Sequence, residues 1–252
     1  MTLHLSRRKG DIYNIPFFVI FFYNSLKQTS IINYLNYKVF LTFFIVKGLM
    51  SVSKYNKRKI SNLDRTFKIN LINSITGLKP ANLIGSTCKG SDNVAIFSSV
   101  IHLGSSPALI GFMIRPQYKK KTDTYLNLLE NPYFTINSIQ KEDIDKAHKS
   151  STKFARDISE FEELNIEKVY IDDYKAPFVK DSLIKIGLHK VEEIKLLNRC
   201  RLIVGKVELV VINNSILESD GNIDFSKSTT TCISGCQNYY NVKLAKQKKR
   251  VK

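Results

Sequence analysis

A cluster of hydroxyl and basic residues between positions 98 and 124 has the composition of a phosphate-binding site. The hydroxyl residues follow one apolar segment, a cation ends the next, and a basic run leads into a polar triplet that opens a predicted helix. Hydroxyls and backbone N–H groups near a helix N-terminus, flanked by cations, are the groups that bind a phosphate. The candidate phosphate ligands are Ser98, Ser99, Arg115, Lys121, Thr122, Asp123 and Thr124.

The sequence lacks the motifs of other phosphate sites and of hydrolytic enzymes. It contains neither GxGxxG nor GxxxxGK[ST], so a Rossmann fingerprint and a P-loop do not explain the cluster. Neither a Ser-His-Asp or Cys-His arrangement nor a carboxylate pair stands out, so nucleophilic catalysis has no candidate set. The four cysteines (Cys88, Cys200, Cys232 and Cys236) do not have zinc-ligand spacing, and we expect no bound metal.

The elements that position these residues are mostly strands. Period-two alternation bounded by turn residues predicts six strands, and cap and stop residues predict three short helices, the first of them capped by Thr122. Cys88–Asn93 predicts a turn, and Arg65–Ser74 fits either a short helix or an entry strand. This pattern indicates a mainly β fold with short helices (α+β) of the barrel type. The expected strands are Pro80–Thr87, Val94–His102, Ala108–Arg115, Tyr133–Ile139, Lys185–Leu197 and Leu202–Ile212, and the expected helices are Thr122–Leu129, Lys141–His148 and Ile158–Asn165.

The order of these motifs resembles the flavin reductase-like family, whose fold is an FMN-binding split β-barrel. The resemblance rests on the strand Asn93–Val100 (NVAIFSSV), the loop proline Pro107, the strand end Arg115-Pro116 and the helix start Asp123-Thr124. It spans roughly residues 60–240. The further matching segments are Phe134–Asn137, Ala147–Ser151, Ser159–Asn165, Ala176–Ser182 and Ile233–Gly235.

The resemblance implies that FMN, or alternatively FAD, binds along the first of these strands, with NAD(P)H as co-substrate. The backbone of Ala95, Ile96 and Phe97 would line the isoalloxazine ring. The hydroxyls of Ser98 and Ser99 would contact the phosphate or the ribityl chain. The flavin would carry the chemistry, while the protein would supply position and electrostatics.

Three positions leave alternatives open. The family often has Arg where this chain has Thr122, and Thr offers one hydrogen bond in place of a charged, bidentate fork. Lys121 or Arg115 would then supply the lost charge. Asn82, on the strand expected beside the flavin, faces either the site or the exterior. His148, the one candidate catalytic residue, is either structural or part of a lid that touches substrate or nicotinamide.

The family resemblance implies an oxidoreductase that transfers hydride from NAD(P)H to flavin. It further implies a homodimer with the flavin at the subunit interface, which passes electrons to free flavin or to an acceptor protein. An FMN-binding electron carrier of the flavoredoxin type, without NAD(P)H turnover, is the alternative. The net charge of +17 is also compatible with a nucleic-acid-binding protein. This alternative is weaker, because basic charge alone does not establish a binding site.

Residues 1–49 differ in composition from the rest of the chain. Their apolar runs, Ile15–Tyr23 and Val39–Val46, are far shorter than the ~20 residues of a membrane helix, so we expect no membrane partner. Our hypothesis is that translation begins at Met50. A membrane anchor and an appended hairpin or helix are the alternatives. The low number of cysteines favours a reducing cytoplasm. The expected organisation is an N-terminal extension (1–49), a flavin reductase-like domain (50–240) and a basic C-terminal tail (241–252).

Overall fold

The computed structural model describes residues 38–39, 52–118 and 121–248. The chain divides into two compact units, Met1–Asn62 and Leu63–Lys252. The first contains the helix α3 (Lys57–Ser61), which is capped by the side chain of Asn56. Apart from 38–39, the predicted extension 1–49 lies outside the described residues, and so do residues 249–252 of the predicted basic tail.

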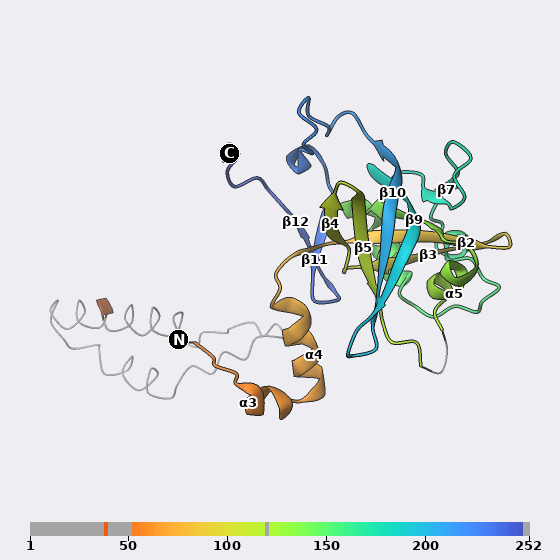
Figure 1. Cartoon of the computed structure of the whole chain (residues 1–252). Coiled ribbons are helices and arrows are strands. Elements are labelled where there is room, and N and C mark those ends of the chain that lie inside the picture. The colour runs from red at the N-terminus through yellow and green to blue at the C-terminus, as the bar shows by residue number, and fades with distance from the viewer. Residues whose placement is uncertain (1–37, 40–51, 119–120, 249–252) are drawn as a thin grey trace, which may run out of the picture. The chain divides into compact units, whose positions relative to one another are not determined.

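A seven-stranded antiparallel sheet forms the body of the second unit (Figure 1). Its strands are rich in Val and Ile, whose β-branched side chains pack well on a pleated surface. Neighbouring strands pair antiparallel throughout. In order across the sheet, the strands are β3 (Ser91–Phe97), β2 (Asn82–Cys88), β6 (Tyr133–Ser138), β9 (Ile184–Lys195), β10 (Arg201–Ile212), β5 (Ala108–Ile114) and β4 (Ile101–Ser105).

The sheet must curl into a barrel because its two edge strands are consecutive in the sequence. A flat seven-stranded sheet would hold its edges roughly 29 Å apart. The three residues that join Phe97 to Ile101 can span at most about 14 Å. Register shifts in the β9–β10 pairing supply part of the curvature. The barrel is therefore split between β3 and β4.

A hydroxyl group bridges this split. Ser99 Oγ donates to the carbonyl oxygen of Met113 at 3.3 Å and accepts from its N–H at 3.2 Å. The linker between β3 and β4 is thereby attached to β5 in the way a short strand would be. This contact brings the end of β3 next to the end of β5.

The barrel interior is a cluster of apolar side chains from five strands and one helix. The rings of Phe112 and Phe134 lie 5.3 Å apart at its centre, and Phe97 packs edge-on against Phe112. The helix α5 (Asp123–Glu130) contributes Tyr125 and Leu128 to this cluster. The buried residues of this inner cluster are Ile84, Phe112, Ile114, Tyr125, Leu128, Phe134, Ile136, Leu188 and Ile203.

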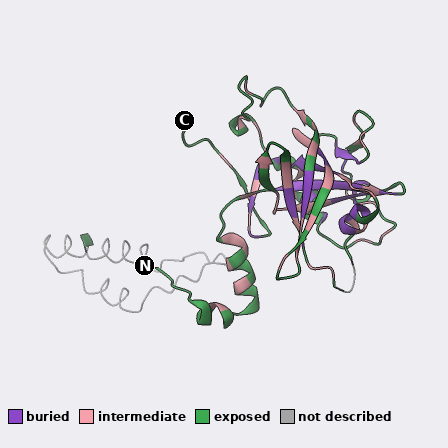
Figure 2. Cartoon of the chain, in the orientation of Figure 1, coloured by how far each residue is buried: buried purple, intermediate pink, exposed green. Residues whose placement is uncertain are grey.

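A second apolar cluster covers the outer face of β2 and β3, and buried residues concentrate in these strands (Figure 2). Side chains of β2 alternate between the clusters, with Leu83 in the outer one and Ile84 in the inner one. Two short helices, α6 (Ile144–Lys149) and α7 (Glu160–Glu163), cover this face through Ala147 and Phe161.

The remaining elements are small. A three-stranded sheet contains β1 (Lys79–Pro80), β11 (Thr231–Ser234) and β12 (Asn238–Asn241), and β7 (Lys168–Val169) pairs with β8 (Phe178–Val179). The helix α4 (Arg65–Ser74) precedes β1, and two 3-10 turns lie at η2 (Lys141–Asp143) and η3 (Phe225–Lys227). None of the helices in the described part of the chain is long and apolar enough to cross a lipid bilayer.

Several predicted boundaries need correction. The prediction of one strand over Val94–His102 is wrong, because β3 ends at Phe97 and β4 starts separately on the opposite edge. The predicted turn Cys88–Asn93 is wrong in extent, because only Lys89 and Gly90, with φ of 50° and 81°, leave the β2–β3 ladder.

The predicted helices agree with the observed ones only in part. Arg65–Ser74 is a helix rather than a strand. Ile158–Asn165 contains only the four-residue helix α7. Thr122 precedes α5 as expected, but its side chain makes no capping hydrogen bond. The side chain of Gln117 accepts from both the N–H and the hydroxyl of Thr122 instead.

Candidate functional site

The structure brings the ends of β3 and β5 and the start of α5 into one region. The Ser99–Met113 contact joins the first two. Gln117 joins the last two, because its Nε2 donates to the carbonyl oxygen of Arg115 and its Oε1 accepts from the N–H of Thr122, both at 2.7 Å. The candidate ligands of the phosphate, dispersed over more than twenty positions of sequence, therefore lie close together. We call Ser98, Arg115, Lys121 and the first turn of α5 the Arg115 site.

Two exposed cations give the Arg115 site its positive charge. Arg115 extends from the end of β5 toward the β11–β12 hairpin, where its Nη2 lies 3.9 Å from Sγ of Cys236. The ammonium of Lys121 lies 5.9 Å from the centroid of the Tyr125 ring. The first backbone N–H groups of α5 have no partner within the helix. Together these groups can accept an anion.

The hydroxyl groups predicted as phosphate ligands have other partners. The hydroxyl of Ser99 donates to the carbonyl oxygen of Met113, and that of Thr122 donates to Gln117 Oε1. The buried Thr124 donates to Asn93 Oδ1 at 3.0 Å. A phosphate oxygen accepts hydrogen bonds but does not donate, so each hydroxyl would have to give up its present acceptor to bind one. Ser98 stays a predicted ligand.

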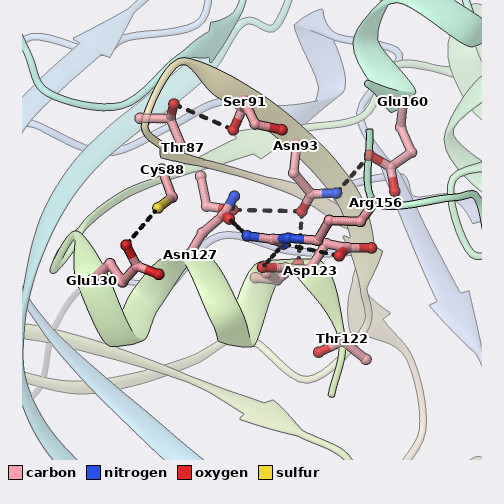
Figure 3. A network of polar contacts seen from close by, with 12 residues as sticks. Thr87, Cys88, Ser91, Asn93, Thr122, Asp123, Asn127, Glu130, Arg156 and Glu160 are labelled. Atoms are coloured by element: carbon pink, nitrogen blue, oxygen red, sulfur yellow. Dashed lines mark hydrogen bonds and ion pairs between the residues drawn. The ribbon is translucent and has the colours of Figure 1, made fainter. Parts of the chain in front are cut away.

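Asn93, Asn127 and Glu160 belong to a polar network beside α5 (Figure 3), and Thr124 joins it through Asn93. Asn93 is its centre: Oδ1 accepts from Thr124 and from Ser86 Oγ, and Nδ2 donates to Glu160 Oε2 at 2.6 Å. Asn127 Nδ2 in turn donates to Ser86 Oγ at 3.2 Å. The network ties α5 to β2, β3 and α7. It holds the first turn of α5 in place from below.

Arg156 is a component of this region that the sequence interpretation missed. Its Nη1 lies 2.8 Å from the Asp123 carboxylate, and its Nη2 donates to Asn127 Oδ1 at 2.8 Å. The Asp123 carboxylate is thus already paired with a cation. The only signal in the sequence was a basic residue between the segments AHKSS and SEFEELN, 33 positions after Asp123.

Glu160 carries the one strongly buried carboxyl group of the network. Burial raises its pKa above the ordinary value of 4.5, and the hydrogen bond from Asn93 opposes this shift. The folded state therefore binds the Glu160 proton more tightly than the unfolded state does. This favours folding below pH 4.5 and is lost as the pH rises through the raised pKa of the folded state.

Replacing Glu160 by glutamine tests this pH dependence. Gln keeps an oxygen that accepts from Asn93 but carries no charge, so we expect the unfolding midpoint to rise by about 2–4 °C at neutral pH. The gain should shrink toward zero as the pH approaches 4.5. Thermal unfolding followed by circular dichroism at several pH values measures it, with the exposed Glu163→Gln as the matched control. A gain that is constant with pH would contradict the assignment.

The residues predicted to line the flavin ring lie at the end of β3 (Ala95, Ile96 and Phe97) and at the start of the neighbouring strand β2 (Asn82). In the β2–β3 register Phe97 pairs with Asn82, and Ala95 pairs with Ile84. Ile96 packs against the outer cluster, while Phe97 packs against the inner one. Asn82 is only 8% exposed, and its Nδ2 has no hydrogen-bond partner. The Asn82 side chain is therefore buried and does not face the exterior, and its contact with a flavin stays a prediction.

His148 contacts the β11–β12 hairpin, which Arg115 also approaches, at Cys236. It is exposed on α6, and its Nδ1 is 3.0 Å from the hydroxyl of Tyr239 on β12, with the two rings edge to face. Its other ring nitrogen has no side-chain partner among the described residues.

Within the described part of the chain, no group of three or more His, Cys, Asp or Glu side chains is arranged to hold a metal ion.

The sequence matches the model of the flavin reductase like domain over residues 79–226, more than half of the chain. This chain belongs to the flavin reductase-like family. The matched segment includes β2 through β10 and every residue of the Arg115 site. None of the curated proteins is significantly similar to it.

Solved structures agree with this assignment. A split-barrel protein of Shewanella frigidimarina assigned as a flavin reductase is 35% identical, with a TM-score of 0.74 over 79% of this chain and 100% of that one. Nitrilotriacetate monooxygenase component B of Bacillus cereus is 17% identical (TM-score 0.70; 78% and 98% covered). Flavoredoxin of Methanosarcina acetivorans is also 17% identical (TM-score 0.60; 79% and 95% covered). The family prediction and the prediction of a mainly β split barrel are confirmed.

Proposed function

We propose that this flavin reductase-like protein binds FMN and transfers hydride from NAD(P)H to the flavin. The observation that carries the proposal is the link that Gln117 makes between the end of β5 at Arg115 and the start of α5 at Thr122, next to Lys121. Membership of the family supports an oxidoreductase activity, and the 35% identical Shewanella protein matches over its whole length. FAD is the alternative cofactor.

The residues present fit a flavin phosphate at one end and a ring at the other. Arg115 and Lys121 would hold the phosphate, with the first turn of α5 as backbone donor. The orphaned amide of Asn82 lies beside Phe97, where the ring would lie against β3. The bound flavin would supply the hydride-accepting chemistry, so the protein needs no dedicated acid or base. Arg156 would act indirectly, by holding Asp123 away from the phosphate.

His148 is the candidate contact to the second substrate. Its ring is held by Tyr239, which leaves the other ring nitrogen directed away from that contact. In this arrangement His148 would touch nicotinamide or an acceptor without taking part in hydride transfer. The role rests on the family resemblance and on this geometry alone.

A homodimer would complete the site. Arg115 and Lys121 are exposed, and the edge strand β4 exposes Ile101 and Leu103 at 44% and 40%. Exposed apolar side chains on an unpaired edge strand favour association with another chain. Sedimentation equilibrium of the full-length protein, with and without FMN, measures the oligomeric state directly.

Visible absorbance of the purified protein tests the proposed function. After addition of FMN and removal of unbound flavin, we expect retained flavin bands that bleach when NADH or NADPH is added anaerobically. Bands that persist with both nucleotides but bleach with dithionite would support an electron carrier instead. A protein that retains neither FMN nor FAD would reject flavin binding, and a salt-dependent retention on nucleic acid would then favour the basic-protein alternative.

A further inference from the structure

Two buried polar atoms at the end of the barrel have no hydrogen-bond partner in the described part of the chain. They are Nδ2 of Asn82 and Oγ1 of Thr230; a third such atom, the hydroxyl oxygen of Tyr174, belongs to a ring that packs against Tyr133 and Phe178. Asn82 starts β2, and Thr230 immediately precedes β11, almost 150 positions later. Neither residue is close to the other in sequence, so their proximity must come from the fold.

Pairing contacts bring both residues to the end of β6. Asn82 pairs with Ser138 at the last position of β6, and Thr230 forms an isolated bridge with Gln140, two positions further on. The N–H of Ala81 also donates to the carbonyl oxygen of Thr231. Asn82 and Thr230 therefore lie on either side of the same short stretch of chain.

Strand alternation places the two side chains on one side of the sheet. Ala81 and Ile139 belong to the outer apolar cluster, and Thr231 is buried against the carbonyl oxygen of Ile139. Their neighbours Asn82 and Thr230 must point the other way, toward the barrel interior. Phe97, the pairing partner of Asn82, packs on that same interior side.

The surrounding polar side chains are satisfied. Gln140 Nε2 donates to Ser138 Oγ at 3.1 Å, and Ser182 Oγ donates to the carbonyl oxygen of Ser138 at 2.7 Å. A buried polar group without a partner destabilises a protein, and native structures rarely contain one. Two such atoms in one place, amid satisfied neighbours, indicate a polar ligand that is missing.

We propose that Asn82 and Thr230 bind the pyrimidine edge of the flavin ring. This edge has two carbonyl oxygens, which accept, and one imide N–H, which donates. Asn82 Nδ2 is a donor and fits a carbonyl oxygen, while the Thr230 hydroxyl can donate to the second carbonyl or accept from the imide. The assignment rests on the proposed flavin binding and adds to it a ring contact that the motifs around the Arg115 site do not include.

Replacing Thr230 by valine separates ligand binding from folding. Valine keeps the shape but removes the hydroxyl, which has no partner in the free protein. We therefore expect the unfolding midpoint of the flavin-free, full-length protein to rise by about 2–4 °C, whereas FMN affinity falls about tenfold. Thr231→Val is the matched control, because its hydroxyl does have a partner and its loss should lower the midpoint.

Asn82→Leu provides an independent test of the proposed contact with the pyrimidine edge of the flavin. It should also weaken FMN binding about tenfold without lowering the stability of the flavin-free protein. Asn137→Leu is the matched control: that buried amide donates to Leu83 and accepts from Val179, so its replacement should be strongly destabilising. Riboflavin, which lacks the phosphate, should show the same fold-loss as FMN with both variants.

The outcomes distinguish this assignment from the proposed function. If the wild-type protein binds FMN but both variants bind FMN and riboflavin with unchanged affinity, the ring contact is rejected and flavin binding stands. If Thr230→Val lowers the midpoint of the flavin-free protein as much as Thr231→Val does, a buried water is the true partner and the ring contact is again rejected. If the wild-type protein binds neither flavin, both proposals fail together.

Discussion

The Asn93→Ala variant is expected to lose about 3 kcal/mol of its free energy of unfolding. Asn93 is buried and makes three side-chain hydrogen bonds, to Ser86, Thr124 and Glu160. Alanine removes all three and leaves the Glu160 carboxyl group without its side-chain partner in a buried position. Removing one member of such a network costs more than one hydrogen bond is worth, because the remaining groups stay desolvated.

Chemical unfolding at neutral pH measures this loss. The exposed turn residue Asn214, replaced by alanine in the same way, should change stability by less than about 0.5 kcal/mol. The double variant Asn93→Ala with Glu160→Gln should recover part of the loss, since it removes the stranded charge. Equal stability of the Asn93 and Asn214 variants would contradict the role assigned to the network.

The same variant should also bind FMN more weakly. Asn93 holds Thr124 in the first turn of α5, and that turn supplies the backbone donors of the Arg115 site. Riboflavin, which lacks the phosphate, is the comparison ligand: the Asn93→Ala substitution should weaken the binding of FMN but not that of riboflavin. Unchanged FMN affinity in a folded Asn93→Ala protein would show that α5 keeps its position without the network.

The Gly85→Ala variant is the second expected large effect. A Cβ atom at Gly85 would overlap the backbone carbonyl oxygen of Pro177 and lie 2.5 Å from Thr135 Oγ1. Pro177 cannot move away easily, because its carbonyl oxygen also accepts from Thr135 Oγ1 at 2.7 Å. We expect a loss of about 3 kcal/mol, as β2 and the segment before β8 are forced apart.

Gly104→Ala is the matched control for this substitution. The nearest atom to a Cβ there is the carbonyl oxygen of Pro107 at 3.5 Å, an ordinary contact distance. Its stability should stay within about 0.5 kcal/mol of the wild type. Chemical unfolding of the two variants side by side decides the matter. A Gly85→Ala protein as stable as Gly104→Ala would mean that the packing of Pro177 on β2 is looser than described.

Most strands could be predicted because they obey local rules. The apolar pattern of Tyr133–Ile139 and the long β9–β10 pair, with its bend at Asn198–Arg201, needed only alternation and turn residues. The division of Val94–His102 could not be predicted in this way. Apolar residues lie on both sides of the break, and only the position of β4 on the opposite edge of the barrel shows that the chain must leave the sheet after Phe97.

The candidate site was predicted in composition but not in its contacts. The residues of the Arg115 site are recognisable from their types and their order along the chain. The partners that use the hydroxyls of Ser99 and Thr124 are 14 and 31 positions away, and Arg156 approaches Asp123 from 33 positions away. These hydrogen bonds depend on which strands and helices become neighbours in the fold, and a local sequence pattern does not predict this.

The sequence by itself determined the family and the mainly β barrel, because these depend on residue type, spacing and order, and it identified the basic region that holds the candidate phosphate ligands. The tertiary structure alone decided which polar groups are already satisfied and which are not. Asn82 and Thr230 illustrate the difference. In the sequence they are two ordinary polar residues, but the fold brings both to the end of β6 and buries Asn82 Nδ2 and Thr230 Oγ1 away from water. An unsatisfied group is defined by its surroundings, and those exist only once distant segments have packed together.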